Sequence, residues 1–473
     1  MISLDTTRLA NRHICEFDLG YFCLITDLTK RSGLQVVITE AFRGIYMYKP
    51  SSYNIITPPL SSGNFVLFNT RTGRALEISE DRRVQYEQFS SGKLLHGELV
   101  AFLAATEFAL RDDVDEALLI KAKYHKAIDA VRKLSITVGL TESCNFRCSY
   151  CYQGHETRQY DDAIVKSFKE VLEKLSDDGY NSLHVNWFGG EPLLRLDLLS
   201  KLSEMAREIC QASDKSFTQF ITTNGSLLTA EKFFALDKLG VSQYQITLDG
   251  PKEFHDGTRP RKGGKSSYQS VLDGCKSVID GGCQLIVRMN LSRPIGDSIE
   301  DWLDDLVAVG CSRNNTAIHI VRAIDHESAL VNDFYYSNEE FAHIWVKCLA
   351  KVKSRGFSIP HVLPLPYNCS FDSGKTVYIN HEGEYGSCSS IPSKKQNNNV
   401  VVDFVPIRFV MSPYEVDHGV QKRSDSFFES NCKKCKFLPS CVGGCQYLEI
   451  SGQEKCTPER YVFHELISLN YDK

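Results

Sequence analysis

Three cysteines in one short loop constrain this chain more than any other feature. Residues 144–151 read Cys-Asn-Phe-Arg-Cys-Ser-Tyr-Cys, and the thiols belong to Cys144, Cys148 and Cys151. The loop follows an apolar run at 134–140 that is typical of a buried strand. Three thiolates can hold three irons of a four-iron cluster and leave the fourth iron open to a small ligand. A structural zinc site would need a fourth protein ligand, and a disulfide framework would need an even number of thiols.

Size and composition are those of an ordinary globular protein. The chain has 473 residues, enough for two or three domains, and 42% of them are hydrophobic and 24% charged. The formal net charge of -5 disfavours a nucleic-acid partner, because nucleic-acid-binding domains usually carry a basic surface. No apolar stretch approaches the length of a membrane span, and the first residues lack the apolar core of a signal peptide. We therefore expect a cytoplasmic protein without a membrane partner.

The cysteine count also points to metal. Seventeen cysteines are many for a chain in the reducing cytoplasm, where stable disulfides are rare. Ten of them fall into groups with ligand-like spacing. The other seven stand alone, and we expect them to be small buried hydrophobic residues: Cys15, Cys23, Cys210, Cys275, Cys283, Cys311 and Cys348.

A small α+β domain is expected over residues 1–110. Alternating apolar residues on both sides of a Thr-Gly pair predict a β-hairpin over 64–78. Helical stretches are expected at 80–88 and 98–103. Residues 111–133, rich in Asp, Glu, Lys and Ala, predict a linking helix.

Short apolar strands then alternate with amphipathic helical stretches over residues 134–330. Apolar residues at helical spacing mark 162–175 and 198–210, for example. Repeated βα units predict an α/β fold with a parallel barrel-like sheet and a site at the carboxyl ends of the strands. Six units are too few for a closed eight-stranded barrel. The expected strands are 134–140, 183–188, 217–222, 243–248, 284–290 and 317–321.

Polar residues stand where these strands end. The second strand ends in Trp187-Phe-Gly-Gly-Glu-Pro192, where two glycines would let backbone approach a ligand closely. The third continues into Thr222-Thr-Asn-Gly225 and the fourth into Thr247-Leu-Asp-Gly250. The fifth places Arg288 and Asn290 on one face, and an arginine can bind a carboxylate through two hydrogen bonds.

Besides the isolated Cys348, seven cysteines lie in the last part of the chain, residues 331–473. Cys388 follows nineteen residues after Cys369, the segment 432–445 contains four cysteines with gaps of two, five and three residues, and Cys456 comes last. Four thiols of the 432–445 segment could by themselves form a zinc ribbon.

The loop at 144–151 and the Gly-Gly-Glu-Pro stretch about forty residues later resemble the signature of radical S-adenosylmethionine (SAM) enzymes. The C-terminal cysteines resemble the SPASM extension of that family. The resemblance covers about residues 134–456 and implies a partial (β/α)6 TIM-like barrel, followed by a SPASM domain with two auxiliary clusters. Three [4Fe-4S] clusters are thereby implied, the first held by Cys144, Cys148 and Cys151. The auxiliary clusters would be held by Cys369, Cys388 and Cys445, and by Cys432, Cys435, Cys441 and Cys456.

The same resemblance implies a SAM site in which the methionine amino and carboxylate groups bind the open iron. The implied SAM contacts are Tyr150, Gly189, Gly190, Glu191, Thr222, Thr223, Asn224, Thr247 and Arg288. Asp249 and His255 fit a role in the site and a role as turn and capping residues equally well. Reductive cleavage of SAM would yield a 5′-deoxyadenosyl radical, which can take hydrogen from an unactivated carbon. No general base stands out by its spacing.

The N-terminal hairpin with its helices resembles the leader-peptide recognition domain of many peptide maturases, although an extension that packs on the catalytic domain explains the same pattern. We therefore expect a maturase that forms a thioether or carbon–carbon crosslink in a ribosomally made peptide. Its partners would be a precursor peptide and an electron donor such as flavodoxin or ferredoxin. A Phe68→Asp substitution in the hairpin would then weaken peptide turnover and spare SAM cleavage.

Two alternatives remain at this point. An anaerobic sulfatase-maturase-type enzyme would make formylglycine with the same cofactors, but such enzymes use an aspartate beside an auxiliary-cluster cysteine, and here Ser389 follows Cys388. An iron–sulfur redox sensor without catalysis is the alternative of another class. The Gly-Gly-Glu-Pro and Thr-Thr-Asn-Gly strand ends disfavour it, because a sensor has no use for a SAM pocket.

Overall fold

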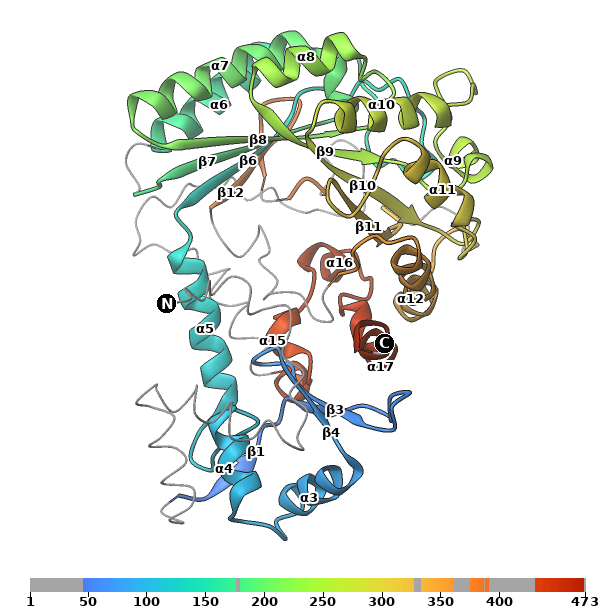
Figure 1. Cartoon of the computed structure of the whole chain (residues 1–473). Coiled ribbons are helices and arrows are strands. Elements are labelled where there is room, and N and C mark those ends of the chain that lie inside the picture. Colours follow the sequence, from blue (N-terminus) through green and yellow to red (C-terminus); the bar gives the residue numbers. More distant parts are fainter. Residues whose placement is uncertain are drawn as a thin grey trace, which may run out of the picture.

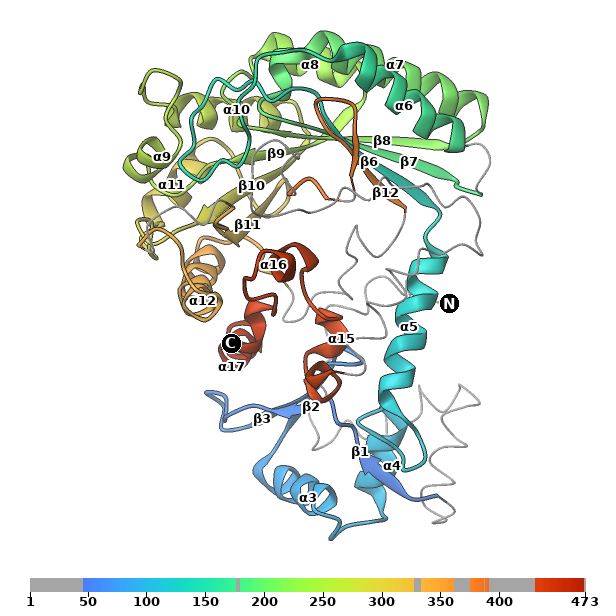
Figure 2. The same ribbon diagram turned by 180° about the vertical axis from the view of Figure 1, so that it is seen from behind.

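The fold is built around one large sheet, shown by the computed structural model in Figure 1. The structure describes residues 46–175, 179–326, 333–360, 375–386, 388–390 and 430–471. Helices cover one face of the sheet, the C-terminal helices lie on its other side, and an N-terminal unit lies beyond them (Figures 1 and 2). Of the expected cysteines, Cys15, Cys23 and Cys369 lie outside the described residues.

All six predicted strands are present, and they lie side by side, in chain order and parallel. They are β6 (Lys133–Gly139), β7 (Ser182–Phe188), β8 (Ser216–Thr223), β9 (Val241–Thr247), β10 (Gln284–Leu291) and β11 (Thr316–Arg322). The predicted partial barrel is therefore confirmed. Two strands that the sequence did not predict extend the sheet beyond β6: β12 (Thr376–Ile379) in parallel and β13 (Tyr385–Gly386) antiparallel. They are too short to show a periodic pattern.

The strands alternate between an apolar face and a polar face. In β7, Leu183, Val185 and Trp187 are fully buried, whereas the residues between them are half-buried. The Trp187 ring lies 6.1 Å from that of Phe168 in α6 (Asp161–Leu175), so the apolar face packs against the helices. The other helices of this layer are α7 (Leu196–Ala212), α8 (Ala230–Lys238), α9 (Lys252–Thr258), α10 (Tyr268–Asp280) and α11 (Glu300–Ala308). The opposite face is left for polar side chains.

One long helix, α12, and several short ones make up most of the described C-terminal part. They are α12 (Asn338–Ser354), η2 (Asn431–Lys434), α15 (Leu438–Cys441), α16 (Gln446–Ile450), η3 (Pro458–Arg460) and α17 (Phe463–Tyr471). A capping box of Ser337 and Glu340 begins α12 and satisfies two backbone N–H groups of its first turn. Among the helices in the described ranges, none combines the length and the apolar character that crossing a membrane requires.

The N-terminal unit contains the predicted hairpin and helices. A three-stranded antiparallel sheet is formed by β2 (Asn54–Ile56), β3 (Phe65–Asn69) and β4 (Arg74–Ile78), followed by α3 (Glu80–Ser90) and α4 (Glu98–Ala105). A separate pair joins β1 (Tyr48–Pro50) to β5 (Ala109–Arg111). The linking helix is present as α5 (Glu116–Ala130), which runs from this unit to the start of β6 (Figure 1).

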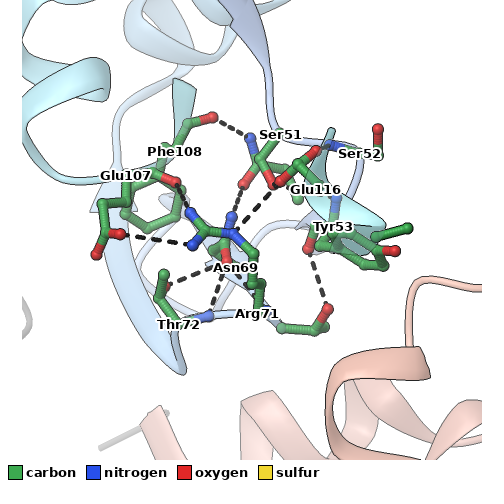
Figure 3. Close-up of polar contacts among 12 residues, drawn as sticks. Ser51, Ser52, Tyr53, Asn69, Arg71, Thr72, Glu107, Phe108 and Glu116 are labelled. Atoms are coloured by element: carbon green, nitrogen blue, oxygen red, sulfur yellow. Dashed lines mark hydrogen bonds and ion pairs between the residues drawn. The ribbon is translucent and has the colours of Figure 1, made fainter. Parts of the chain in front are cut away.

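A buried polar cluster fixes the start of α5 (Figure 3). Glu116 is 6% exposed, and its carboxylate accepts hydrogen bonds from Ser51 Oγ and from the backbone N–H of Ser52, both at 2.6 Å. Arg71 Nε lies 3.4 Å from the same carboxylate. A buried carboxylate needs such partners, and here they tie the first turn of α5 to the hairpin and to the segment after β1.

The hairpin sheet packs directly on the C-terminal cysteine segment. Lys436 Nζ donates a hydrogen bond to Asn54 O at 2.6 Å, and Thr70 Oγ1 donates one to Lys436 O. Phe68 is 3% exposed and meets the ring of Phe463 edge-on, with 5.3 Å between the ring centres. Phe68→Asp is therefore unsuitable as a test of peptide binding. The substitution would bury a charge in this interface and disturb folding.

Candidate active site

Backbone hydrogen bonds hold the three-cysteine loop in place above β6. Arg147 N donates to Pro260 O at 2.8 Å, and Ser149 N donates to Thr258 O at 2.9 Å. Thr258 is the last residue of α9, and Pro260 lies in the segment that follows it. The loop is thus fixed between the first strand of the barrel and a segment about a hundred residues later in the chain.

The three predicted thiols lie together. The pKa of each is raised mainly by burial and further by one of the other two: Cys148 acts on Cys144, Cys151 on Cys148, and Cys144 on Cys151. For Cys144 and Cys148 the pKa rises to about 11. The metal-free loop therefore holds neutral thiols, and binding iron would release their protons. Three adjacent, half-buried thiols fit the donor set of a four-iron cluster with one open iron.

Two glycines at the end of β7 pack against the base of this loop. Gly190 N donates to Thr141 O at 2.7 Å, and Glu191 N donates to Ser143 O at 2.9 Å. A Cβ on Gly190 would lie 2.4 Å from Ser143 O, and one on Gly189, whose φ is +130°, would lie 2.5 Å from Thr141 O. The close approach that the glycines allow is thus to the protein's own loop. Their contact with a ligand stays a prediction.

Glu191 joins the ends of β7 and β8. Its side chain is fully buried; Oε1 accepts a hydrogen bond from Thr223 Oγ1 at 2.6 Å, and Oε2 accepts one from Asn224 N at 2.8 Å. Burial raises the pKa of Glu191, while these hydrogen bonds oppose the rise. Asn224 Nδ2 then donates to Asn145 Oδ1 at 2.8 Å and lies 3.8 Å from Cys144 Sγ. Glu191 therefore links the strand ends to the cysteine loop.

Three further predicted SAM contacts share the polar face of the sheet. Thr247 and Arg288 are direct neighbours across β9 and β10. Thr222 in β8 donates a hydrogen bond to Asn186 Oδ1 at 3.2 Å. Arg288 Nε donates to Asn290 Oδ1 at 3.1 Å, and burial lowers the pKa of this guanidinium. A hydroxyl and a guanidinium side by side can bind a carboxylate or a ribose, and that role stays a prediction.

A buried polar centre lies beside the cysteine loop. Asp249 is fully buried and accepts hydrogen bonds from Asn290 N at 2.7 Å and from the hydroxyl of Tyr150. Arg259 donates to the same hydroxyl and lies 3.8 Å from Asp249. His255 Nδ1 accepts the backbone N–H of Asp249 at 3.1 Å, which is a turn-stabilising role. The Tyr150 hydroxyl is therefore held by a charged pair that sequence reasoning did not connect to it.

A triad beside this loop has the composition of a metal site, because one ligand atom each of Glu142, Glu156 and His381 lies within 4.8 Å of the other two. His381, in the turn between β12 and β13, lies between two carboxylates, with Nδ1 3.6 Å from Glu142 and Nε2 3.6 Å from Glu156. Composition and spacing alone do not assign a metal to this triad, since clustered carboxylates are common without one.

Six of the seven predicted C-terminal ligand cysteines lie in the described part of the chain, and their assignment to two clusters stays a prediction. Burial raises the pKa of Cys441 to about 11, and the nearby thiols of Cys456, Cys435 and Cys432 contribute to the same rise. Cys388 and Cys445 both raise the pKa of Tyr447, so both lie near its hydroxyl. Four gathered thiols fit the ligand set of a four-iron cluster, although ligation itself stays a prediction.

An aromatic bridge connects the 144–151 loop to the residues around Cys388 and Tyr447. Tyr152, directly after Cys151, donates its hydroxyl to Ser389 O at 2.7 Å. Its ring centre lies 4.6 Å from that of His326, and His326 Nδ1 lies 2.6 Å from the hydroxyl of Tyr447. No pattern in the sequence predicts this bridge, because its three rings are far apart in the chain.

The expectation for the isolated cysteines is confirmed for four of them. Cys210, Cys275, Cys311 and Cys348 are buried, whereas Cys283 is half-buried. None of these five takes part in a disulfide in the described structure.

Comparison with known proteins identifies one domain of the chain. Residues 138–313 match the family model described as the radical SAM superfamily. The chain contains a radical SAM domain. Enzymes with this domain bind a four-iron cluster and SAM.

Its relatives include peptide and protein maturases. The chain is 25% identical over 346 residues to the serine-type anaerobic sulfatase-maturating enzyme of Bacteroides thetaiotaomicron, a match that covers 64% of this chain and 80% of that protein. It is 26% identical over 211 residues to the sporulation killing factor maturation protein SkfB of Bacillus subtilis, covering 44% of this chain and 48% of SkfB. The solved structure of native anSMEcpe with bound AdoMet and Cp18Cys peptide superimposes with a TM-score of 0.54 at 16% identity, covering 72% of this chain and 99% of that one. That likeness shows a shared fold.

Proposed function

We propose that this radical SAM enzyme is a peptide maturase that forms a thioether or carbon–carbon crosslink in a ribosomally synthesised peptide. The observation that carries the proposal is a set of thiols outside the radical SAM domain: Cys432, Cys435 and Cys456 lie close to Cys441, and Cys388 and Cys445 both lie near Tyr447. Such groups fit two auxiliary four-iron clusters, which can accept an electron when a substrate is oxidised. Names of similar proteins, a sulfatase-maturating enzyme and a sporulation killing factor maturation protein, support a peptide or protein substrate.

The proposed cofactors are three [4Fe-4S] clusters and SAM. When bound at the 144–151 loop, the first cluster and SAM would supply the 5′-deoxyadenosyl radical that takes hydrogen from the peptide. The chain's own residues would position them: the glycines after β7 and Glu191 fix the loop, and Arg288 and Thr247 offer a cation and a hydroxyl on the polar face. We infer domains at 1–110, 111–133, 134–330 and 331–473 for peptide recognition, linkage, radical chemistry and auxiliary clusters.

The N-terminal unit is the proposed binding site for the leader of the precursor peptide. It consists of a three-stranded sheet with two helices, and the match to the anSMEcpe structure leaves more than a quarter of this chain without a counterpart. The unit packs directly on the C-terminal cysteine segment, so a leader bound to it would lie close to the proposed auxiliary clusters. A flavodoxin or ferredoxin would supply the electron.

The sulfatase-maturase-type reaction is the second candidate. It is favoured by the match to the Bacteroides enzyme, which spans 80% of that protein. The two reactions give different products, since formylglycine carries an aldehyde and a crosslink does not.

Anaerobic co-expression with a small peptide encoded beside this chain tests the proposal. We expect a product that has lost two hydrogen atoms per crosslink, with fragmentation blocked between the joined residues. A product that reacts with an aldehyde probe would support formylglycine formation instead. A peptide of unchanged mass, made with an enzyme that cleaves SAM, would contradict the crosslinking function.

A further inference from the structure

The positively charged side chain of Arg460 contacts a sulfur of the C-terminal cysteines. Its Nη1 donates a hydrogen bond to Cys456 Sγ at 3.0 Å. The guanidinium also lies 5.4 Å from the centre of the Tyr461 ring, and the hydroxyl of Tyr461 is hydrogen-bonded to Glu454. The side chain is exposed to solvent, yet contacts on two sides orient it toward the sulfur.

The backbone around Cys456 is fixed independently of Arg460. Asn338, 4% exposed at the start of α12, donates from Nδ2 to Cys456 O at 2.7 Å. On the other side, Cys445 N donates to Lys455 O at 3.3 Å, and a Cβ on Gly444 would lie only 2.1 Å from that oxygen. Substituting Arg460 should therefore change the charge at the sulfur while leaving the path of the chain intact.

In the described part of the chain, the carboxylates next to Arg460 in sequence have partners of their own. Glu449 is paired with Lys455, and Glu454 accepts a hydrogen bond from Tyr461. The carboxyl group of Glu459 is largely buried, and burial raises its pKa, so it holds its negative charge less readily than an exposed glutamate.

We propose that Arg460 tunes the reduction potential of a four-iron cluster held by Cys432, Cys435, Cys441 and Cys456. The inference rests on the proposed function, which gives these four cysteines their ligand role. Reduction adds one negative charge to the cluster, and a hydrogen bond from a cation to a ligand sulfur stabilises that charge. Arg460 thereby raises the potential of this one cluster and makes it the better electron acceptor.

Redox titration followed by electron paramagnetic resonance tests this assignment. We use the full-length, anaerobically reconstituted protein with the cysteines of the 144–151 loop replaced by alanine, so that signals of the first cluster are absent. Arg460→Met should make reduction of one auxiliary cluster about tenfold less favourable, a shift of about 59 mV for one electron. Arg460→Lys keeps the charge but loses the planar guanidinium, so the reduction potential of this cluster should lie between those of Arg460→Met and the wild type. The potential of the other cluster should not change.

Arg355→Met is the matched control. Arg355 is an exposed arginine whose Nε donates to Asp304 at 2.7 Å, and its replacement should leave both potentials unchanged. Equal potentials in Arg460→Met, Arg355→Met and the wild type, at equal iron content, would overturn the proposal. If Arg460→Met loses iron, Arg460→Lys decides: a wild-type potential with full iron would overturn the tuning role, and an intermediate one would support it. A failure of the proposed function itself gives a different result. If the four cysteines do not bind a cluster, Cys441→Ala will leave the iron content of the parent protein unchanged.

Discussion

Gly190→Ala should damage the radical site while sparing the rest of the fold. The new Cβ would lie 2.4 Å from Ser143 O and 2.5 Å from Glu142 O, both backbone atoms of the cysteine loop. Ordinary contact begins at 3.4 Å, so the loop must move away by about 1 Å. That movement would stretch the hydrogen bonds that join the end of β7 to the loop.

Two magnitudes follow from this displacement. Overpacking of a tight contact typically costs about 1–3 kcal/mol of folding stability. A misplacement of about 1 Å in a reacting group can cost about 100-fold in rate. We therefore expect Gly190→Ala to lower the rate of 5′-deoxyadenosine formation by about 100-fold. The melting temperature should fall only by the equivalent of about 1–3 kcal/mol, which leaves the protein folded at the assay temperature. Chromatography of the reduced, reconstituted enzyme with SAM measures the rate, and calorimetry measures the melting.

Gly257→Ala is the matched control. Gly257 lies in α9, and a Cβ there would meet nothing within 4 Å. Alanine is the better helix former, so this variant should keep the full rate and gain up to about 1 kcal/mol. A wild-type rate of 5′-deoxyadenosine formation in Gly190→Ala would refute the argument that this contact positions the cysteine loop.

Three other predictions concern the cysteine loop, its polar neighbour and the N-terminal unit. Replacing the three cysteines of the 144–151 loop by alanine should abolish SAM cleavage and leave about eight irons bound, which iron analysis would show. Tyr150→Phe removes the hydroxyl that donates a hydrogen bond to the buried Asp249. The melting temperature should therefore fall by the equivalent of about 1–3 kcal/mol. An unchanged melting curve would argue against that contact. Val84→Asp, on α3 at 39% exposure, should weaken precursor-peptide binding and spare SAM cleavage, whereas Val307→Asp, at 47% exposure on α11, should affect neither.

The barrel could be predicted because its signals are local. Each strand shows its own apolar run, and the helices between strands show their own periodicity, so the βα order is written in consecutive residues. The pair β12 and β13 could not be predicted in this way. Four and two residues are too few for a pattern, and β12 joins the sheet through β6, more than two hundred residues earlier.

The site was predictable in its residue types and less so in its contacts. Spacing identified the cysteine groups, and the structure gathers those that it describes. The spacing of residues did not reveal that the glycines after β7 pack on the loop at 141–143. Nor did it reveal that Tyr150 is hydrogen-bonded to Asp249 and Arg259. These contacts join segments about fifty to a hundred residues apart, and only the fold brings such segments together.

Deuterium transfer tests the central claim most directly. A precursor peptide deuterated at the carbon that reacts is incubated with SAM, reductant and the reconstituted enzyme, and the 5′-deoxyadenosine is examined by mass spectrometry. Because the radical takes hydrogen from the peptide in our account, the 5′-deoxyadenosine should contain one deuterium for each modified peptide. Modified peptide together with 5′-deoxyadenosine that contains no deuterium, whichever carbon is labelled, would contradict it.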